Sequence, residues 1–381
     1  MNRAAFQLPF TRRFCFYSTS GANRLLSKAS NHATWAAMSK PTRDLAQSIT
    51  ETGPIQRRVA LSRAITLMES KNLEHKQQAD NLLTYLLAKR PKDQEPSLRI
   101  GFAGPPGTGK STMIEAFGMH LLEKDPDLRL AAVCIDPASG ISGGSILGDK
   151  TRMTELSRHN RAYVRPSSNA GVLGGLAAYT DDVVTTLSAA GYPLILLETV
   201  GLGQSEIEVA QSVDILILLL PPGGGDELQG VKKGIVELAN IIAVTKADGN
   251  LLEAAKKTAS DYRGALRVLQ ISGSNTENIF KPPVIMTSSV AKDGLDDLWQ
   301  SIQDYKAFLM ENDRWEKMRQ RQSKYWMWKQ FTRLMQQYMK SDPELGDKAQ
   351  HLESELLHGD LTPRVAAQEL LEGVFGSLRK K

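Results

Sequence analysis

The chain has few residues that could form disulfides or bind soft metals. Only two cysteines occur among its 381 residues, Cys15 and Cys134, and its six histidines are scattered. Cys15 lies in a basic leader and Cys134 in an apolar segment, which excludes a disulfide framework. No C-x-x-C pair is present, which excludes a metal site built from thiolates and imidazoles. No apolar run approaches the roughly 18 residues of a membrane-spanning helix, so we expect no membrane association.

Acidic residues are missing from the first 43 positions, which hold seven basic side chains. Without these seven, the 47 basic residues of the chain fall to 40, against 42 acidic ones. The formal charge of +5 therefore comes from the leader, and the nearly neutral body gives no reason to expect nucleic-acid binding. An Arg-rich, Ser-rich, acid-free leader with interspersed phenylalanines is typical of a mitochondrial transit peptide. We expect the mature protein in the mitochondrial matrix.

The strongest motif is the run Gly104-Pro105-Pro106-Gly107-Thr108-Gly109-Lys110-Ser111, which completes G-x-x-x-x-G-K-[ST]. An apolar segment precedes it, and a helix-compatible run begins at Thr112. The glycines let backbone N–H groups turn inward around a phosphate. Lys110 can reach the β- and γ-phosphates, the Ser111 hydroxyl can ligate Mg²⁺, and the helix presents its positive end. The run predicts a P-loop that binds a nucleoside triphosphate.

Short apolar segments alternate with amphipathic helical patterns from residue 98 onward. We expect strands at 98–103, 129–135, 161–165, 193–198, 214–220, 241–245 and 283–288. Such apolar strands spaced by helices predict an α/β fold with a mostly parallel sheet flanked by helices. Ligands of such sheets bind at the carboxyl ends of the strands.

Helical patterns lie on both sides of this region. Three precede it, at 44–52, 54–70 and 73–90, and two short ones end the chain, at 343–358 and 362–375. Between the sheet and the last two, neither proline nor glycine interrupts residues 295–338, which as one helix would span about 66 Å. Trp328, Phe331, Met335 and Tyr338 recur on it at helical spacing. A helix so long and aromatic predicts a subunit interface; the alternative is a helix folded back on its own domain and broken near Asn312-Asp313.

Acidic side chains at strand ends and in one glycine-rich loop are candidates for a magnesium site. Glu198 ends the strand 193–198 and can hold Mg²⁺ through its water shell. Asp136 follows the second strand, and Asp149 lies in the glycine-rich loop after it. Gly201 can offer its backbone N–H to a γ-phosphate.

A second group of residues indicates which base is bound. Asp248 can accept hydrogen bonds from N1–H and the exocyclic amine of guanine, whereas adenine presents an acceptor at N1. The stem of Lys246 can lie along the purine, and the Thr245 hydroxyl can donate to the neighbouring P-loop. Ser288 and Ser289, which end the last strand, can add a backbone N–H to the guanine oxygen. These motifs favour GTP over ATP.

The loop 223–234 is also rich in glycine and charge and contains Asp226, Lys232 and Lys233. We interpret it as a moving segment, with a static connecting loop as the alternative. Gln204 lies three residues beyond Gly201, which is a poor position for orienting the attacking water. We therefore expect slow intrinsic hydrolysis, with Lys110, Glu198, Asp226 and Lys232 as the catalytic candidates.

Several motifs together resemble the MeaB/ArgK family of GTPases. They are GPPGTGKST, IDPAS, SGGSILGDKTRM, ETVGLGQSE, GDELQGVKKGI and TKADGN. The similarity runs from about residue 44 to the C-terminus. It implies a homodimeric GTPase that uses GTP, GDP and Mg²⁺ and chaperones adenosylcobalamin-dependent methylmalonyl-CoA mutase. Such a protein gates cofactor loading and protects or reactivates the mutase, with the adenosyltransferase that supplies the cofactor as a further partner.

The resemblance also implies roles for individual residues. Lys110 and Ser111 would contact phosphate and metal, and Asp248 would read guanine. The acids of the magnesium site would be Asp136, Asp149 and Glu198. The segment around Asp226, Lys232 and Lys233 would be the switch that couples the nucleotide to the mutase. The cobalamin would belong to the partner, because no D-x-H-x-x-G motif is present.

We therefore expect four regions: a leader over 1–43, a helical extension over 44–97, a P-loop GTPase domain over 98–293 and a helical dimerisation region over 294–381. Two other functions compete with this hypothesis. A nickel or cobalt metallochaperone GTPase needs Cys or His ligands near the nucleotide, which this sequence does not offer. A small-molecule kinase needs a pocket for a phosphate acceptor, and analysis of the reaction products would separate it from a GTPase.

Overall fold

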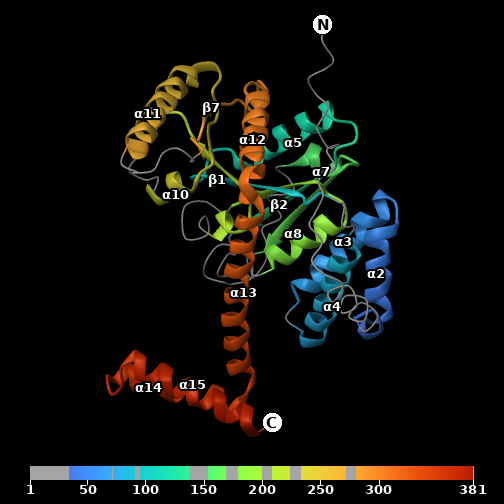
Figure 1. The fold of residues 1–381 in the computed structure, drawn as a ribbon, viewed down its shortest axis with the longest axis vertical. Coiled ribbons are helices and arrows are strands. Elements are labelled where there is room, and N and C mark those ends of the chain that lie inside the picture. The colour runs from blue at the N-terminus through green and yellow to red at the C-terminus, as the bar shows by residue number, and fades with distance from the viewer. Residues whose placement is uncertain are drawn as a thin grey trace. The chain divides into compact units, whose positions relative to one another are not determined.

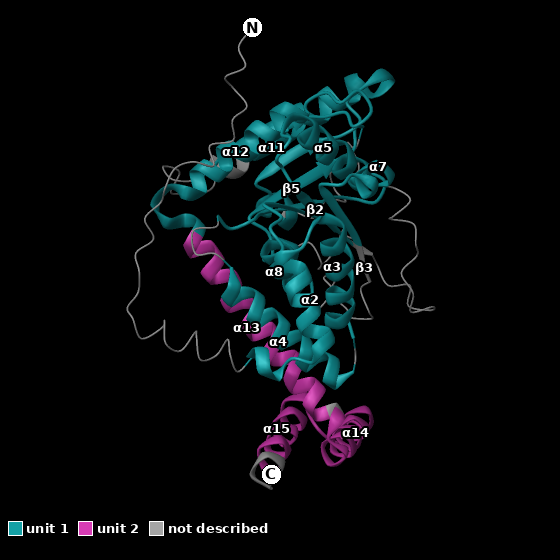
Figure 2. Cartoon of the chain, turned by 90° about the vertical axis from the view of Figure 1, so that its right-hand side faces the viewer, with its two compact units in different colours: residues 1–315 teal, residues 316–381 magenta. Residues whose placement is uncertain are grey.

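The computed structural model describes residues 34–70, 72–90, 95–136, 153–168, 179–199, 208–223, 233–271 and 280–380. Two compact units divide the chain, residues 1–315 and residues 316–381 (Figure 2). No helix in the described ranges is both long and apolar enough to cross a membrane.

A seven-stranded parallel sheet forms the centre of the first unit (Figure 1). Its strands are β1 (Leu98–Ala103), β2 (Leu130–Asp136), β3 (Ala162–Ser168), β4 (Leu194–Glu198), β5 (Ile215–Leu220), β6 (Ile241–Val244) and β7 (Val284–Met286). Their order is β3-β2-β4-β1-β5-β6-β7, and every neighbouring pair is parallel. The strands β4, β5 and β6 are buried along their whole length, as parallel strands covered on both faces must be. The predicted fold class and all seven strands are confirmed.

Two strand ends differ from the prediction by more than one residue. The strand β7 ends at Met286, two residues before the predicted end at 288, so Ser288 and Ser289 follow the last strand instead of ending it. The strand β3 runs on through Pro166 to Ser168, three residues beyond the predicted end at 165. A proline cannot donate to a sheet ladder, so it is tolerated chiefly on edge strands. Because β3 is the edge strand and pairs only with β2, it has a side without ladder hydrogen bonds, and a proline is tolerated there.

Helices cover the sheet (Figure 1). They are α5 (Lys110–Lys124), α7 (Thr154–Arg158), α8 (Thr180–Ala189), α10 (Lys233–Leu238), α11 (Leu252–Ile271) and α12 (Leu295–Met310). Phe117 of α5 lies between the rings of Phe102 on β1 and Trp299 on α12, with centroids 6.3 and 6.1 Å away. The P-loop helix is thereby fixed against the centre of the sheet.

The three predicted N-terminal helices are present as α2 (Lys40–Glu51), α3 (Pro54–Met68) and α4 (Leu73–Lys89). The Asn72 side chain caps α4 by accepting from the backbone of its first turn, and Pro54 opens α3, where a missing N–H is harmless. Both α3 and α4 pack against α8, and the Thr186 hydroxyl of α8 donates to the Met68 sulfur at 3.6 Å. This helical extension is therefore part of the first unit.

The continuous helix predicted over 295–338 is wrong. It is divided into α12 and α13 (Arg314–Ser341) by a 3₁₀ turn, η4 (Glu311–Asp313). Asn312 and Asp313 have φ of 55° and 57°, a left-handed conformation that ends a right-handed helix. The break lies where the alternative interpretation placed it, and α12 packs back on its own unit, where Tyr305 accepts from Asn240 at 2.8 Å. The helices α14 (Pro343–His358) and α15 (Pro363–Lys380) follow α13 and pack on each other.

Candidate nucleotide-binding site

The P-loop joins the carboxyl end of β1 to the first turn of α5. Gly107 and Gly109 have φ of 80° and 87°, and no atom lies within 4 Å of where their Cβ would be. Gly104 is required for a different reason, because a Cβ there would lie 2.4 Å from the Leu219 carbonyl oxygen. Gly109 is the N-cap of α5 and supplies no capping side chain, so the first N–H groups of the helix remain for an anion.

Lys110 is buried at the mouth of this loop. Its ammonium donates to the carbonyl oxygens of Gly104 and Pro105 at 3.0 and 3.2 Å. The side chain is thus held over the loop, where phosphate oxygens would compete with the two carbonyls for its protons. This geometry is what a lysine that binds β- and γ-phosphates requires.

Ser111 and Glu198 meet at the side of the loop. The serine hydroxyl of α5 donates to the Oε1 atom at the end of β4 at 2.6 Å, and both side chains are buried. A hydroxyl and a carboxylate are the hard oxygen ligands that Mg²⁺ prefers, and this ion keeps several waters and phosphate oxygens around it. The pair therefore fits a magnesium site, although no group of three or more His, Cys, Asp or Glu side chains in the described part of the chain could hold a metal.

The other proposed metal ligands are less defined. The strand β2 ends at Asp136, whose backbone pairs with Ser168 of β3. This is the carboxyl end of the sheet, where Glu198 also lies. The side chain of Asp136 and the whole of Asp149 lie outside what the structure describes. Gly201, Gln204, Asp226 and Lys232 also lie outside the described residues. Their predicted roles stay predictions.

The guanine motif is tied directly to the P-loop. The Thr245 hydroxyl, just after β6, donates to the Thr108 carbonyl at 2.8 Å, which confirms the predicted bond. The Lys246 ammonium donates to the Gly107 carbonyl, also at 2.8 Å. Lys246 itself has a φ of 54°, a left-handed conformation that is unusual for a lysine. In this conformation its ammonium reaches the loop carbonyl. Two hydrogen bonds thus connect the Thr245-Lys246 segment to the P-loop.

Asp248 and Ser288 lie together at the base end. The Ser288 hydroxyl donates to the Asp248 carboxylate and accepts from the Ala291 backbone at 2.9 Å. These bonds fix the carboxylate that would face N1–H and the amine of guanine. The backbone N–H of Ser288 already donates to the Asp293 carbonyl at 3.0 Å, so the N–H of Ser289 is the better candidate for the guanine oxygen.

Two supporting residues were missed from the sequence. The backbone N–H of Thr287 donates to the Val244 carbonyl at 2.8 Å, and its carbonyl accepts from the Ala247 N–H at 3.0 Å. These bonds join the segment that contains Asp248 to the one that contains Ser288. Gly294 has a φ of 70°, and a Cβ there would lie 2.1 Å from the Met286 carbonyl oxygen. The Asp293-Gly294 pair was the available signal, because that dipeptide marks a tight turn.

Comparison with known proteins gives consistent matches. The family model described as methylmalonyl Co-A mutase-associated GTPase MeaB matches residues 61–344. A mouse protein named methylmalonic aciduria type A homolog, mitochondrial, is 40% identical over 322 residues, covering 83% of this chain and 76% of the mouse protein. A probable GTPase of Mycobacterium bovis is 42% identical over 315 residues, covering 83% of this chain and 91% of that protein. A solved structure titled LAO/AO transport system kinase superposes with a TM-score of 0.63 at 28% identity, over 94% of this chain and 99% of its own.

Proposed function

The chain belongs to the MeaB family of methylmalonyl-CoA mutase-associated GTPases, and we propose that it is a GTP-hydrolysing chaperone of that mutase. Family and relatives are named as GTPases, and the protein is a GTPase. The observation that supports a guanine-nucleotide site is the pair of bonds from Thr245 and Lys246 to the P-loop, because they tie the segment that contains Asp248 to the phosphate loop. The family description supports the mutase as client.

In the proposed reaction, GTP binds with its phosphates in the P-loop and its base against Asp248. The Lys110 ammonium leaves the two loop carbonyls and donates to β- and γ-phosphate oxygens, which stabilises negative charge as the γ-phosphate departs. Glu198 keeps the Ser111 hydroxyl oriented toward the metal position. Mg²⁺, when bound there, would neutralise charge on the β- and γ-phosphates.

The proposed coupling runs through Asp226 and Lys232. Binding of the mutase would bring the Lys232 cation to the γ-phosphate, or the Asp226 carboxylate to the attacking water, and so stimulate a slow intrinsic reaction. The nucleotide state would gate delivery of adenosylcobalamin. The adenosyltransferase that makes this cofactor is the proposed upstream partner. The acid-free leader and the mitochondrial name of the mouse relative support the mitochondrial matrix as location. Tagged chains with and without residues 1–43 should differ in import into isolated mitochondria; equal import would contradict this location signal.

We also propose a homodimer formed through α13. Four large apolar side chains of this helix, each more than half exposed, fall on one stripe: Met327 (55%), Trp328 (56%), Phe331 (53%) and Leu334 (58%). A self-complementary stripe of this kind suits a twofold interface, which buries the same patch on both copies. Phe331→Glu should halve the molar mass measured by light scattering, and Gln336→Glu, on the opposite side of the helix, should not. A monomeric unmutated protein would contradict the proposal.

Phosphate release with and without methylmalonyl-CoA mutase tests the central proposal. The mutase should raise GTP turnover by roughly tenfold or more, which corresponds to at least about 1.4 kcal/mol of barrier. Lys232→Ala should lose most of this stimulation, whereas Lys256→Ala, an exposed lysine on α11, should respond like the unmutated protein. Without stimulation the mutase is not the client; a normally responding Lys232→Ala overturns only the switch assignment.

The kinase title of the superposed structure keeps one alternative open. A kinase would transfer the γ-phosphate to a small acceptor rather than to water. The same assay, run with labelled GTP, should recover the label as inorganic phosphate. Recovery in a phosphorylated small molecule would favour the kinase.

A further inference from the structure

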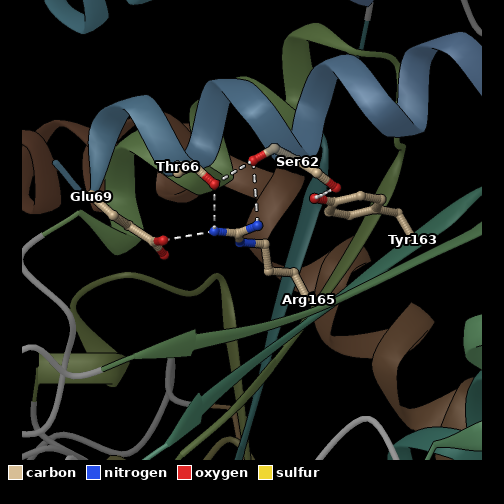
Figure 3. A network of polar contacts seen from close by, with 5 residues as sticks. All are labelled: Ser62, Thr66, Glu69, Tyr163 and Arg165. Carbon is tan, nitrogen blue, oxygen red and sulfur yellow. Dashed lines mark hydrogen bonds and ion pairs between the residues drawn. The ribbon is translucent and has the colours of Figure 1, made fainter. Parts of the chain in front are cut away.

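The edge strand β3 is fastened to the N-terminal helix α3 by a polar network (Figure 3). Tyr163 and Arg165, two residues apart on one face of the strand, meet Ser62, Thr66 and Glu69, which follow one face of α3 and its C-terminal cap. The hydroxyls of Tyr163 and Ser62 lie 3.2 Å apart. Burial raises the pKa of the Tyr163 phenol, so this hydroxyl stays neutral and serves only as a hydrogen-bonding group.

Arg165 makes the strongest contact of the network. One terminal nitrogen lies 2.6 Å from a Glu69 carboxylate oxygen and 3.4 Å from the Thr66 hydroxyl, and the other donates to the Ser62 carbonyl at 3.4 Å. Its Nε atom is buried and makes no hydrogen bond in the described part of the chain. The two charged side chains are only 18% and 20% exposed, and an ion pair so shielded from water holds its geometry better than one on the surface.

The position of this network in the sheet gives it a consequence for the metal site. A strand at the edge has a ladder on one side only, so β3 is held by β2 and by whatever covers its face. In that ladder Val133 pairs with Arg165 and Asp136 pairs with Ser168. The ion pair therefore lies three residues, about 10 Å, from the strand ends. Whatever fixes Arg165 also fixes the backbone from which Asp136 extends.

We propose that Glu69 and Arg165 are positioning residues for the magnesium site, because they hold the carboxyl ends of β2 and β3 beside the end of β4, where Glu198 accepts from Ser111. This inference rests on the proposed function and deepens it, because it makes the N-terminal helices part of the nucleotide site. Neither residue touches the nucleotide. We expect them to change the affinity for the metal, as residues that hold metal ligands in place without binding the metal themselves typically do.

The test is the affinity of Mn²⁺, used as a spectroscopic probe for Mg²⁺, in the complex with a non-hydrolysable GTP analogue. Electron paramagnetic resonance reports bound Mn²⁺ without relying on turnover. Glu69→Gln should weaken Mn²⁺ binding by about tenfold and raise the Mg²⁺ concentration for half-maximal GTP hydrolysis to a similar degree. The KM for GTP at saturating Mg²⁺ should change less than about twofold, because the P-loop and base contacts stay intact.

Two further variants separate positioning from simple stabilisation. The charge swap Glu69→Arg with Arg165→Glu should restore most of the Mn²⁺ affinity. Glu95→Gln breaks a more exposed pair at the amino end of the sheet, where Glu95 lies 3.7 Å from Lys306, and it should leave Mn²⁺ binding unchanged. Should Glu69→Gln not fold, Arg165→Lys keeps the charge but loses the planar fork and should show the same loss.

The outcomes are distinct. A variant that melts earlier but binds Mn²⁺ normally, or a swap that restores nothing, overturns the positioning role and leaves the proposed function standing. An unmutated protein that hydrolyses GTP without a divalent cation overturns the magnesium site and this inference together.

Discussion

The two ends of the central sheet use polar residues in opposite ways. At the amino end, Arg99 and Asp214 form an ion pair of 2.7 Å in which the Asp214 side chain is fully buried. The same two residues also exchange backbone bonds, from Arg99 N–H to the carboxylate at 2.9 Å and from Asp214 N–H to the Arg99 carbonyl at 2.8 Å. At the carboxyl end, Lys110 and Lys246 donate to carbonyls of a glycine loop instead.

This difference separates stability from function within one sheet. Burial lowers the pKa of Arg99, but Asp214 and, to a smaller extent, Asp181 more than offset it, and the net shift is upward, so Arg99 stays charged. Carbonyl oxygens are weaker partners for an ammonium than a carboxylate or a phosphate, because hydrogen bonds between two charged groups are the strong ones. The carboxyl end can therefore exchange its contacts for a ligand, and the amino end cannot.

The largest expected effect is at the carboxyl end. Lys110→Ala removes the cation that we propose stabilises the departing phosphate, and we expect GTP turnover to fall by about a thousandfold or more, near 4 kcal/mol of barrier. The melting temperature should stay close to that of the unmutated protein. Lys257→Ala, an exposed lysine on α11, is the control. Full activity of Lys110→Ala would contradict the claim that the carboxyl end of the sheet carries the function.

The next effect is at the amino end and concerns stability. Asp214→Asn leaves the Arg99 guanidinium buried without its counter-ion, and the free energy of unfolding should fall by about 3 kcal/mol. Where the variant is folded, its KM for GTP should be normal. Glu253→Gln, which breaks an exposed pair with Lys256, should cost less than about 0.5 kcal/mol. Denaturant titration measures the stability and steady-state kinetics the KM. A variant Asp214→Asn that is as stable as the unmutated protein but binds GTP poorly would contradict the assignment of stability to the amino end.

A smaller effect separates the base contact at the carboxyl end from the phosphate contacts. Asp248→Asn keeps the P-loop but exchanges an acceptor for a donor, and GTP affinity should fall by about a hundredfold, near 2.7 kcal/mol. Xanthosine triphosphate should gain affinity, because the amide can donate to the xanthine oxygen. Competition binding with both nucleotides measures the switch; an unaltered preference for GTP would remove Asp248 from the base site.

Most of the fold could be predicted because its signals are local. A buried parallel strand is apolar along its whole length, as Leu194–Glu198 is until its last residue, and the P-loop is contiguous in sequence. The donation from Thr245 to Thr108 could be anticipated because both residues belong to motifs with fixed roles. These features need no knowledge of which distant segments meet.

The remaining features depend on contacts between segments far apart in the sequence or on the backbone angles of single residues. The bond between Glu69 and Arg165 joins residues 96 positions apart, and neither belongs to a nucleotide motif. The break at Asn312-Asp313 could be foreseen only as an alternative, because asparagine and aspartate occur both in left-handed turns and within helices. The predicted strand 161–165 stops short of Pro166, and the edge position that lets β3 continue through this proline depends on how the strands are ordered in the sheet.

Calorimetric titration of the unmutated protein with GTP and with ATP, in the presence of Mg²⁺, tests most directly whether the carboxyl end of the sheet is a guanine-nucleotide site. The carboxylate fixed by Ser288 should favour GTP by about a hundredfold or more, because it would face an acceptor at N1 of adenine. Equal affinities for the two nucleotides would contradict the account.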